Sequence, residues 1–336
     1  MEAAAVSSLV ALALAAPAPA PPPRDTGAVL YRAWCQTCHG ADGRGVPSAM
    51  VRLEVPPANL ADCRTSTPEP EERWIKVVTD GGASVGLSMD MPAFGEGASR
   101  EQIRDIVRYV RSLCGEPGWP PGELNFARPF LVEKPFPENE WVLVEEGRQQ
   151  ELIYERRLTK RLQIEANARS VFDSAGSPFQ GAGAALKYNV WHDLSRHALA
   201  SAGLEVTPPI GRQDVWELDG FLSAAVAPAN LLVFQGEISA TWERGAGIVN
   251  WSYRGGVGKP VGRFVPMLEA AWDVPAGARQ HQLTLYPQTW FQLSRLGHVA
   301  ASVGVAIPVA GPSPSDPRLI AFLLWDYGDA PLNKGW

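Results

Sequence analysis

Apolar and polar side chains alternate along one segment after another from about residue 140 onwards. Residues 162–169, 232–243 and 249–255 show the pattern most clearly. A period of two places successive side chains on opposite faces of a β-strand, so each segment predicts a strand with one apolar and one polar face. Similar segments lie near residues 141–147, 150–158, 181–192, 196–207, 214–227, 263–273, 280–292, 297–308 and 317–327. We therefore expect an all-β meander of about ten to twelve antiparallel strands joined by short turns.

Such a meander can close in two ways. In a soluble barrel or sandwich the apolar face points inward. In an outer-membrane barrel it meets lipid, the lumen holds polar side chains, and aromatic residues gather at both membrane interfaces. The segment lengths and the tryptophans near the segment ends favour a closed transmembrane barrel, with a soluble β domain as the alternative. These tryptophans are Trp191, Trp216, Trp242, Trp272, Trp290 and Trp325.

Composition excludes other classes of protein. The formal net charge of −6 provides no basic surface for nucleic acid, so we expect no nucleic-acid partner. No window offers the roughly eighteen uninterrupted apolar residues of a membrane-spanning helix. If this chain enters a bilayer, it does so with strands.

Two low-complexity tracts divide the chain. Residues 1–23 consist of an Ala/Val/Leu run and an Ala/Pro tract, which is typical of a signal peptide, although Met1 and Glu2 supply no basic n-region. A disordered Ala/Pro tail is the alternative. Residues 115–138 are rich in proline and favour an extended, semi-rigid linker. We expect an exported protein with an all-α domain at residues 26–114 and the β domain at residues 139–336.

The first domain carries a Cys-x-x-Cys-His motif formed by Cys35, Cys38 and His39. Two thiols at this spacing can each form a thioether to a haem vinyl group, and the adjacent imidazole can then ligate the iron. A thioredoxin-like redox pair has no use for His39, and half of a zinc site would need further Cys or His residues at close spacing, which do not follow. The motif predicts one covalently attached haem c per chain.

Residues 26–114 resemble class I cytochromes c. Gly27 to Trp34 form a short helix before the motif, with Gly27 and Tyr31 one turn apart. Ser99 and Gln102 form a capping box that opens a last helix. Its apolar stripe consists of Ile103, Ile106, Val107, Val110 and Leu113. The resemblance implies that this helix crosses the first one, with an aromatic residue such as Tyr109 at the contact.

The resemblance also implies the axial ligands. Residues 88–94 are similar to the family's Met-Pro ligand loop, which makes Met91 the sixth iron ligand opposite His39. Met89 and Met50 are rivals, but Pro92 follows Met91 and fixes the backbone beside its sulfur. Pro47 matches the proline whose carbonyl accepts the His39 ring N–H.

Three further features have less specific interpretations. A middle helix begins at Pro68 and Glu69 and ends at Gly81-Gly82, with Trp74 and Val78 packing near the haem. Cys63 and Cys114 form either a disulfide or two buried thiols. In the β domain, Glu145-Glu146 and Glu155-Arg156-Arg157 are interpreted as solvated faces. The histidines there, interpreted as surface or lumen residues, are His192, His197, His281 and His298.

The sequence shows no nucleophile–base pair and no phosphate-binding glycine loop, so we expect an electron carrier and not an enzyme. The leading hypothesis is a periplasm-facing mono-haem cytochrome c that exchanges single electrons with periplasmic redox proteins and is anchored in outer-membrane lipid by the barrel. One alternative is a channel whose haem domain is a plug or sensor. Another is a cytochrome acceptor with a soluble β docking domain for a periplasmic enzyme.

Overall fold

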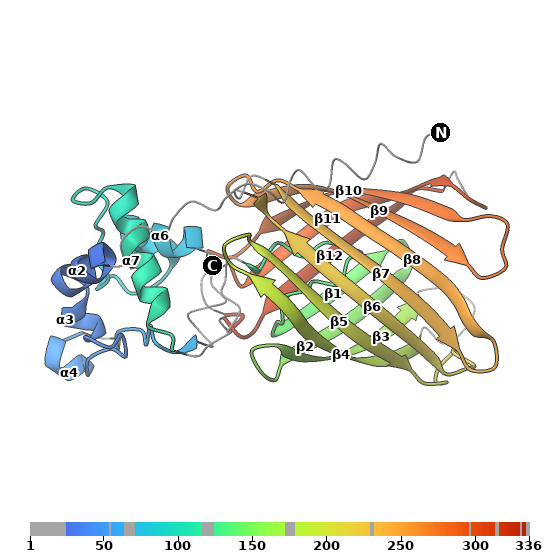
Figure 1. The fold of residues 1–336 in the computed structure, drawn as a ribbon, viewed down its shortest axis with the longest axis horizontal. Helices are drawn as coiled ribbons and strands as arrows, with labels where there is room; N and C mark the ends of the chain where they lie inside the picture. Colours follow the sequence, from blue (N-terminus) through green and yellow to red (C-terminus); the bar gives the residue numbers. More distant parts are fainter. Residues whose placement is uncertain are drawn as a thin grey trace.

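The computed structural model describes residues 25–53, 55–63, 71–115, 124–171, 179–228, 232–295, 297–312, 316–329 and 331–333. The predicted signal peptide and the predicted start of the middle helix at Pro68 and Glu69 lie outside these residues. A small helical domain sits at one mouth of a large β-barrel (Figure 1). In the part of the chain that is described, no helix has the length and apolar character needed to cross a membrane.

Short helices build the first domain around a crossing of its first and last members. They are α2 (Asp25–Trp34), α3 (Gln36–His39), α4 (Ser48–Val51), α6 (Glu71–Asp80), the 3-10 helix η1 (Gly82–Val85) and α7 (Arg100–Ser112). The predicted capping box opens α7: the Ser99 side chain accepts from the Gln102 backbone N–H at 3.2 Å, and the Gln102 side chain accepts from the Ser99 N–H at 2.8 Å. Ile103, Ile106, Val107 and Val110 of the predicted stripe are buried.

The contact between α2 and α7 explains two residues of the sequence pattern. A Cβ atom on Gly27 would lie 2.1 Å from the Asp105 carbonyl oxygen, so only glycine lets the two backbones approach this closely. One turn later, the Tyr31 and Tyr109 rings lie 5.1 Å apart between their centroids. The predicted helix crossing, with Tyr109 at the contact, is confirmed.

The second domain is a closed barrel in which every strand pairs antiparallel with its neighbours and β1 pairs with β12. Its strands are β1 (Glu140–Glu146), β2 (Gln149–Arg157), β3 (Leu162–Val171), β4 (Phe179–Asp193), β5 (Ala198–Thr207), β6 (Glu217–Val226), β7 (Val233–Glu243), β8 (Gly247–Gly258), β9 (Phe264–Pro275), β10 (Gln282–Gln292), β11 (Val299–Ala310) and β12 (Arg318–Asp326). Twelve strands agree with the upper limit of the prediction, and each corresponds to one alternating segment.

The two faces of the barrel wall are reversed relative to a soluble barrel. On β6, Leu222 is 63% exposed on the outer surface, whereas the next residue, Ser223, is buried. On β3, Ile164 is exposed and its neighbour Gln163 is fully buried. Because a lone barrel wall has only an outer surface and a lumen, the exposed apolar set faces outward and the buried polar set faces inward. This is the arrangement predicted for a membrane barrel.

The lumen is occupied by residues 124–138, which we call the plug segment. Phe130 and Leu131 donate their backbone N–H groups to Glu269 on β9, and the Glu138 N–H donates to Gln163 on β3. Strands β3 and β9 lie on opposite sides of the closed strand order, so a segment that bonds to both crosses the lumen. Residues 124–138 belong to the tract expected as a linker, and they fill the barrel before the chain enters β1.

Candidate functional site

The Cys-x-x-Cys-His motif forms a tight turn at the start of α3. Cys35 is the N-terminal cap residue of this helix, and its carbonyl accepts the backbone N–H of His39 at 2.9 Å. The short helix places Cys35, Cys38 and His39 along one wall of a single cavity. Both thiols are free and partly buried.

The cavity holds about 500 Å³, within the range of roughly 300–1,000 Å³ of cofactor sites. Its lining is mostly apolar and includes Trp34, Leu53, Val55, Leu87, Phe94 and Ile106. Such walls exclude water from a bound cofactor.

Met91 lies on the wall of the same cavity, while its two rivals point into solvent. The Met91 backbone is held on both sides, because its carbonyl accepts from Gly82 N–H at 3.0 Å and its N–H donates to Ser88 at 3.3 Å. Met89 is 87% exposed and Met50 is 76% exposed. Of the three candidate methionines, only Met91 lines the cavity with His39.

The predicted partner of the His39 ring is wrong. Nδ1 of His39 lies 3.2 Å from the carbonyl oxygen of Ala58, and not at Pro47. The reason is the path of the loop: the Leu60 N–H donates to the Gly43 carbonyl at 2.7 Å, which folds the later segment back beside the motif. A proton on Nδ1 that is donated to Ala58 leaves Nε2 as the nitrogen that can ligate a metal.

Burial controls the protonation of the motif. Desolvation lowers the pKa of His39 below its ordinary value, and the hydrogen bond to Ala58 opposes this only in part. A lowered pKa keeps the imidazole neutral near pH 7, which is the form that binds iron. Desolvation, and then the charge of Cys38, raise the pKa of Cys35 to about 11. Reactive Cys-x-x-Cys pairs depend on lowered thiol pKa values, so this environment disfavours the thioredoxin-like alternative.

One buried donor in the wall fits a ligand with acceptor oxygens. Nε1 of Trp74 is buried and has no hydrogen-bond partner among the described residues. The Trp74 ring lines the cavity, and the Arg111 guanidinium lies 5.7 Å from its centroid. A haem fits this cavity: two thiols, an imidazole and a thioether are available for covalent attachment and ligation, and a propionate could satisfy the Trp74 N–H.

A disulfide crosslinks the helical domain. Cys63 and Cys114 are bonded, with their Cα atoms 5.1 Å apart, and they tie the middle loop to the residues just after α7. Of the two interpretations left open by the sequence, the structure has the disulfide.

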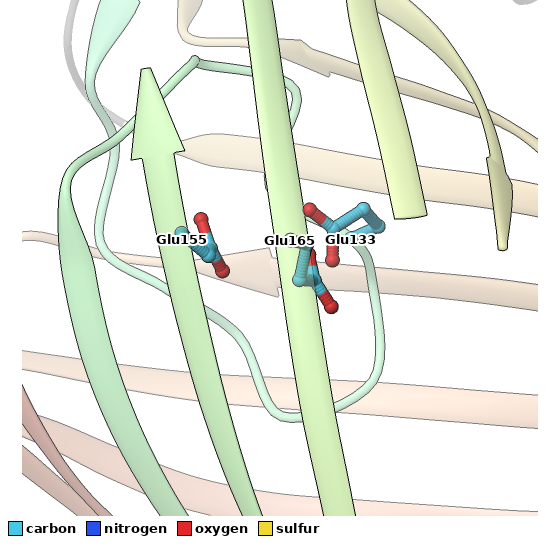
Figure 2. A group of neighbouring side chains, drawn as sticks. All are labelled: Glu133, Glu155 and Glu165. Carbon is cyan, nitrogen blue, oxygen red and sulfur yellow. The ribbon is translucent and has the colours of Figure 1, made fainter. Parts of the chain in front are cut away.

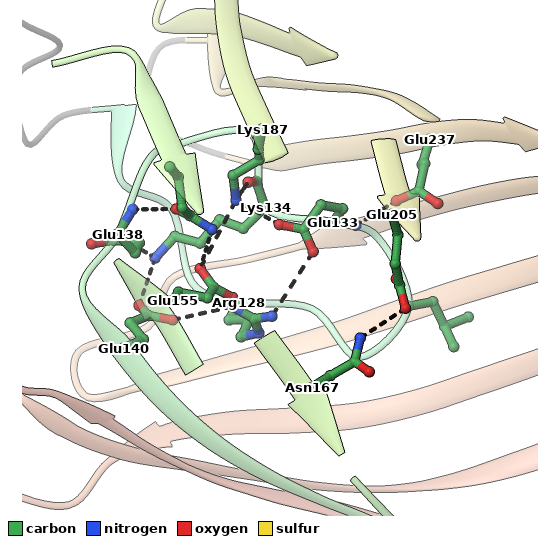
Figure 3. Close-up of polar contacts among 12 residues, drawn as sticks. Arg128, Glu133, Lys134, Glu138, Glu140, Glu155, Asn167, Lys187, Glu205 and Glu237 are labelled. Atoms are coloured by element: carbon green, nitrogen blue, oxygen red, sulfur yellow. Dashed lines mark hydrogen bonds and ion pairs between the residues drawn. The ribbon is translucent and has the colours of Figure 1, made fainter. Parts of the chain in front are cut away.

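The plug segment forms a second cluster of functional groups inside the barrel. Arg128 donates to Glu140 at 3.1 Å and also to Glu155, and Lys134 donates to Glu138 at 2.7 Å (Figure 3). Lys187 on β4 donates to the Lys134 carbonyl oxygen at 2.7 Å. The interpretation of Glu155 as part of a solvated face is wrong, because its side chain is fully buried in the lumen.

Three carboxylates in this cluster come within metal-binding distance of one another, but cationic side chains already pair with two of them. Glu133, Glu155 and Glu165 group together, as Figure 2 shows. Lys187 forms ion pairs with Glu133 and, at 3.9 Å, with Glu155. This network was not predictable from the sequence, because two of its cations, Arg128 and Lys134, lie in an aperiodic, proline-rich tract and meet partners on separate strands.

Comparisons with known proteins agree with the two-part description. The family described as "Cytochrome C oxidase, cbb3-type, subunit III" matches residues 22–110. The helical domain is therefore a cytochrome c-like domain, although the match covers only this part of the chain. No curated protein sequence matches the chain.

Several solved structures are similar to the barrel region. The KdgM porin in complex with disordered oligogalacturonate is 9% identical, with a TM-score of 0.44, over 55% of this chain and 96% of the porin. An outer membrane channel from Pseudomonas putida F1 is 11% identical, with a TM-score of 0.45, over 60% of this chain and 99% of the channel. LpxR from Salmonella typhimurium is 8% identical, with a TM-score of 0.34, over 55% of this chain and 99% of that protein. Closure of the barrel is established here by its own strand pairing.

Proposed function

We propose that this protein is a membrane-anchored c-type cytochrome that carries single electrons. The observation that supports this most directly is the placement of Cys35, Cys38, His39 and Met91 around one apolar cavity. A haem held there would supply one-electron exchange between ferrous and ferric iron. Cys35 and Cys38 would attach it, and His39 and Met91 would ligate the iron. The thioether of Met91 is a soft, neutral ligand that favours the ferrous state.

Haem attachment and ligation can be tested separately. The purified chain should retain haem after denaturation, and its mass should exceed that of the polypeptide by one haem. Cys35→Ala/Cys38→Ala should lose this covalent haem. Met91→Ala should keep the haem but lose the weak red charge-transfer band of methionine-ligated ferric haem, whereas the matched variant Met89→Ala should keep both. Survival of the band in Met91→Ala would falsify the ligand assignment.

We propose further that the barrel spans the outer membrane of an exported protein. Its exposed apolar side chains face outward along the strands, and buried charged side chains such as Glu155, Lys187 and Glu269 face the lumen. The longest connection, residues 208–216 between β5 and β6, lies at the mouth away from the haem domain. Outer-membrane barrels place their longer loops outside and shorter turns in the periplasm, which supports a periplasm-facing haem domain and periplasmic redox partners.

Membrane insertion has a direct test. The haem-stained protein should fractionate with outer membranes and should run faster on a gel before boiling than after. In intact cells the helical domain should resist added protease, and it should become sensitive once the outer membrane is opened. Recovery of all the haem-stained protein without detergent would exclude the barrel as a membrane anchor.

The plug segment supports an anchor over an open channel. It crosses the lumen, and its Phe136 is fully buried in a cluster with Leu199 and Ala225. Its backbone is also bound by lumen side chains: Gln235 donates to the Ala127 carbonyl at 3.0 Å, and Arg254 donates to the Leu131 carbonyl at 3.1 Å. A segment with these contacts obstructs solute passage.

A channel remains the second candidate, because the lumen wall behind the plug is polar and largely acidic. In planar bilayers the full chain should show no stable conductance in either redox state. Replacing residues 124–138 with a Gly/Ser sequence of equal length should open a conducting, cation-preferring barrel. Steady conductance of the unaltered chain, changing with haem redox state, would favour the channel with a haem sensor.

A further inference from the structure

The wall of the haem-domain cavity is not built by the helical domain alone. Asp329, which follows β12 at the end of the barrel, lines the same cavity as Cys35, Cys38, His39 and Met91. It lies far from them in the sequence and belongs to the other domain. From this juxtaposition we propose that the barrel rim completes the haem site and that the Asp329 carboxylate lowers the haem reduction potential. The inference rests on the proposed haem binding.

Asp329 is held in place by the barrel. The Asp326 side chain accepts the backbone N–H groups of Gly328 and Asp329, at 2.9 and 3.2 Å. The Tyr327 N–H donates to the Asn139 carbonyl at 3.0 Å, and the Tyr327 hydroxyl donates to the Glu155 carbonyl at 2.9 Å. The turn that carries Asp329 is therefore fixed to the start of β1 and to β2.

On the side of the helical domain, Arg73 lies close to the same end of the barrel. Arg73 on α6 lines the cavity together with Asp329. A Cβ atom built on Gly297, in the turn between β10 and β11, would lie 3.3 Å from Nη1 of Arg73. The next residue, His298, accepts the Asp326 backbone N–H at its carbonyl at 2.8 Å. Arg73 thus lies beside the β10–β11 turn, which is hydrogen-bonded to the end of β12 that carries Asp329.

The sign of the effect follows from charge. Ferric haem carries one more positive charge than ferrous haem, so a nearby carboxylate stabilises the ferric form and a nearby guanidinium destabilises it. Among the described residues, the acidic and basic side chains that line the cavity, besides the neutral His39, are Arg73, Asp90 and Asp329. Because most of the wall is apolar, these charges are less screened than they would be in open solvent. Asp329 is the one that the barrel contributes.

The experiment is a spectroelectrochemical titration of the full-length, haem-loaded protein in detergent. Asp329→Asn should raise the midpoint potential, so that at the unaltered protein's midpoint the ferrous-to-ferric ratio rises about two- to tenfold. Asp329→Glu keeps the carboxylate, so its midpoint potential should lie near that of the unaltered protein. Arg73→Gln should shift the midpoint in the opposite direction, a reversal that a merely structural role would not produce. Asp316→Asn, at the other mouth of the barrel, is the matched control and should leave it unchanged.

The outcomes separate this inference from the proposed function. If the unaltered chain holds no covalent haem, the proposed function fails. If the unaltered chain holds haem, and haem-loaded Asp329→Asn has the same midpoint potential as the control variant, the contribution of the barrel is refuted. The proposed cytochrome function is then unaffected. If Asp329→Asn does not assemble, Asp329→Ser repeats the test with a smaller neutral side chain. If Asp329→Asn and Asp329→Ser both lost haem while Asp329→Glu kept it, that result would also support the inference that the barrel supplies part of the wall of the haem site.

Discussion

Arg128 of the plug segment donates to Glu155 of β2, and both side chains are buried: that of Arg128 is 8% exposed and that of Glu155 is 0% exposed. Arg128 also reaches Glu140 at 3.1 Å, so one cation joins the plug to two neighbouring strands. Two buried carboxylates beside one guanidinium cannot lose that cation without leaving negative charge in a poorly solvated lumen. The pair therefore holds the plug inside the barrel.

Arg128→Met should destabilise the barrel strongly. Removing one partner of a buried pair costs about 3–5 kcal/mol. Lys134 still pairs with Glu140 at 3.2 Å and Lys187 with Glu155 at 3.9 Å, so we expect a loss near the lower end of this range. Chemical unfolding of the detergent-solubilised protein, followed by intrinsic tryptophan fluorescence, measures this. The control is Arg100→Gln, which breaks an exposed pair with Glu72 in the helical domain and should cost at most about 1 kcal/mol. Equal losses for the two variants would contradict the role assigned to Arg128.

Gly27→Ala should disrupt the crossing of α2 and α7. The added Cβ would lie 2.1 Å from the Asp105 carbonyl oxygen and 3.1 Å from the Tyr109 Cβ, so the helices must separate. Overpacking of this kind typically costs about 1–3 kcal/mol and here also moves Tyr31, which lines the cavity. Thermal melting followed by the helical circular dichroism signal should show the loss. Gly97→Ala, whose nearest neighbouring atom would be 4.0 Å away, should melt like the unaltered protein.

The Cys63–Cys114 disulfide should stabilise the helical domain by restricting its unfolded state. The two cysteines are separated by 51 residues in the sequence, and chain-entropy arguments give about 4 kcal/mol for a loop of that size. Cys63→Ser/Cys114→Ser should therefore unfold at lower denaturant concentration when the haem absorbance is monitored. A thiol reductant should weaken the unaltered protein similarly but leave the double variant unaffected, since thioether bonds to haem resist reduction. If reductant changed the unfolding midpoint of neither protein, the disulfide would not be stabilising.

The sequence predicted those parts of the protein in which local pattern decides structure. Alternation predicted the strands because burial on one face acts at every second residue, as Leu222 and Ser223 show. The capping box predicted the start of α7 because its hydrogen bonds are local. The plug could not be predicted in the same way: Arg128 and Phe136 are positioned by partners on distant strands, and proline-rich sequence carries no period. For the same reason the His39 partner was misplaced, since Ala58 reaches it only through the folding of the intervening loop.

Leu222→Arg tests the orientation of the barrel wall. Leu222 is 63% exposed in the middle of β6, on the face that we place against lipid, and a charged residue near the bilayer midplane costs about 2–4 kcal/mol. The substitution should therefore lower the free energy of unfolding in phospholipid vesicles by about that amount. The control is Val261→Arg: this residue is also exposed, at 53%, but it lies in the turn between β8 and β9, where the cost should be about 0–1 kcal/mol. In a soluble barrel both positions would face water, and both variants would cost about the same small amount. A large loss for Leu222→Arg and a small one for Val261→Arg therefore requires a lipid-facing wall, whereas equal small losses would exclude one.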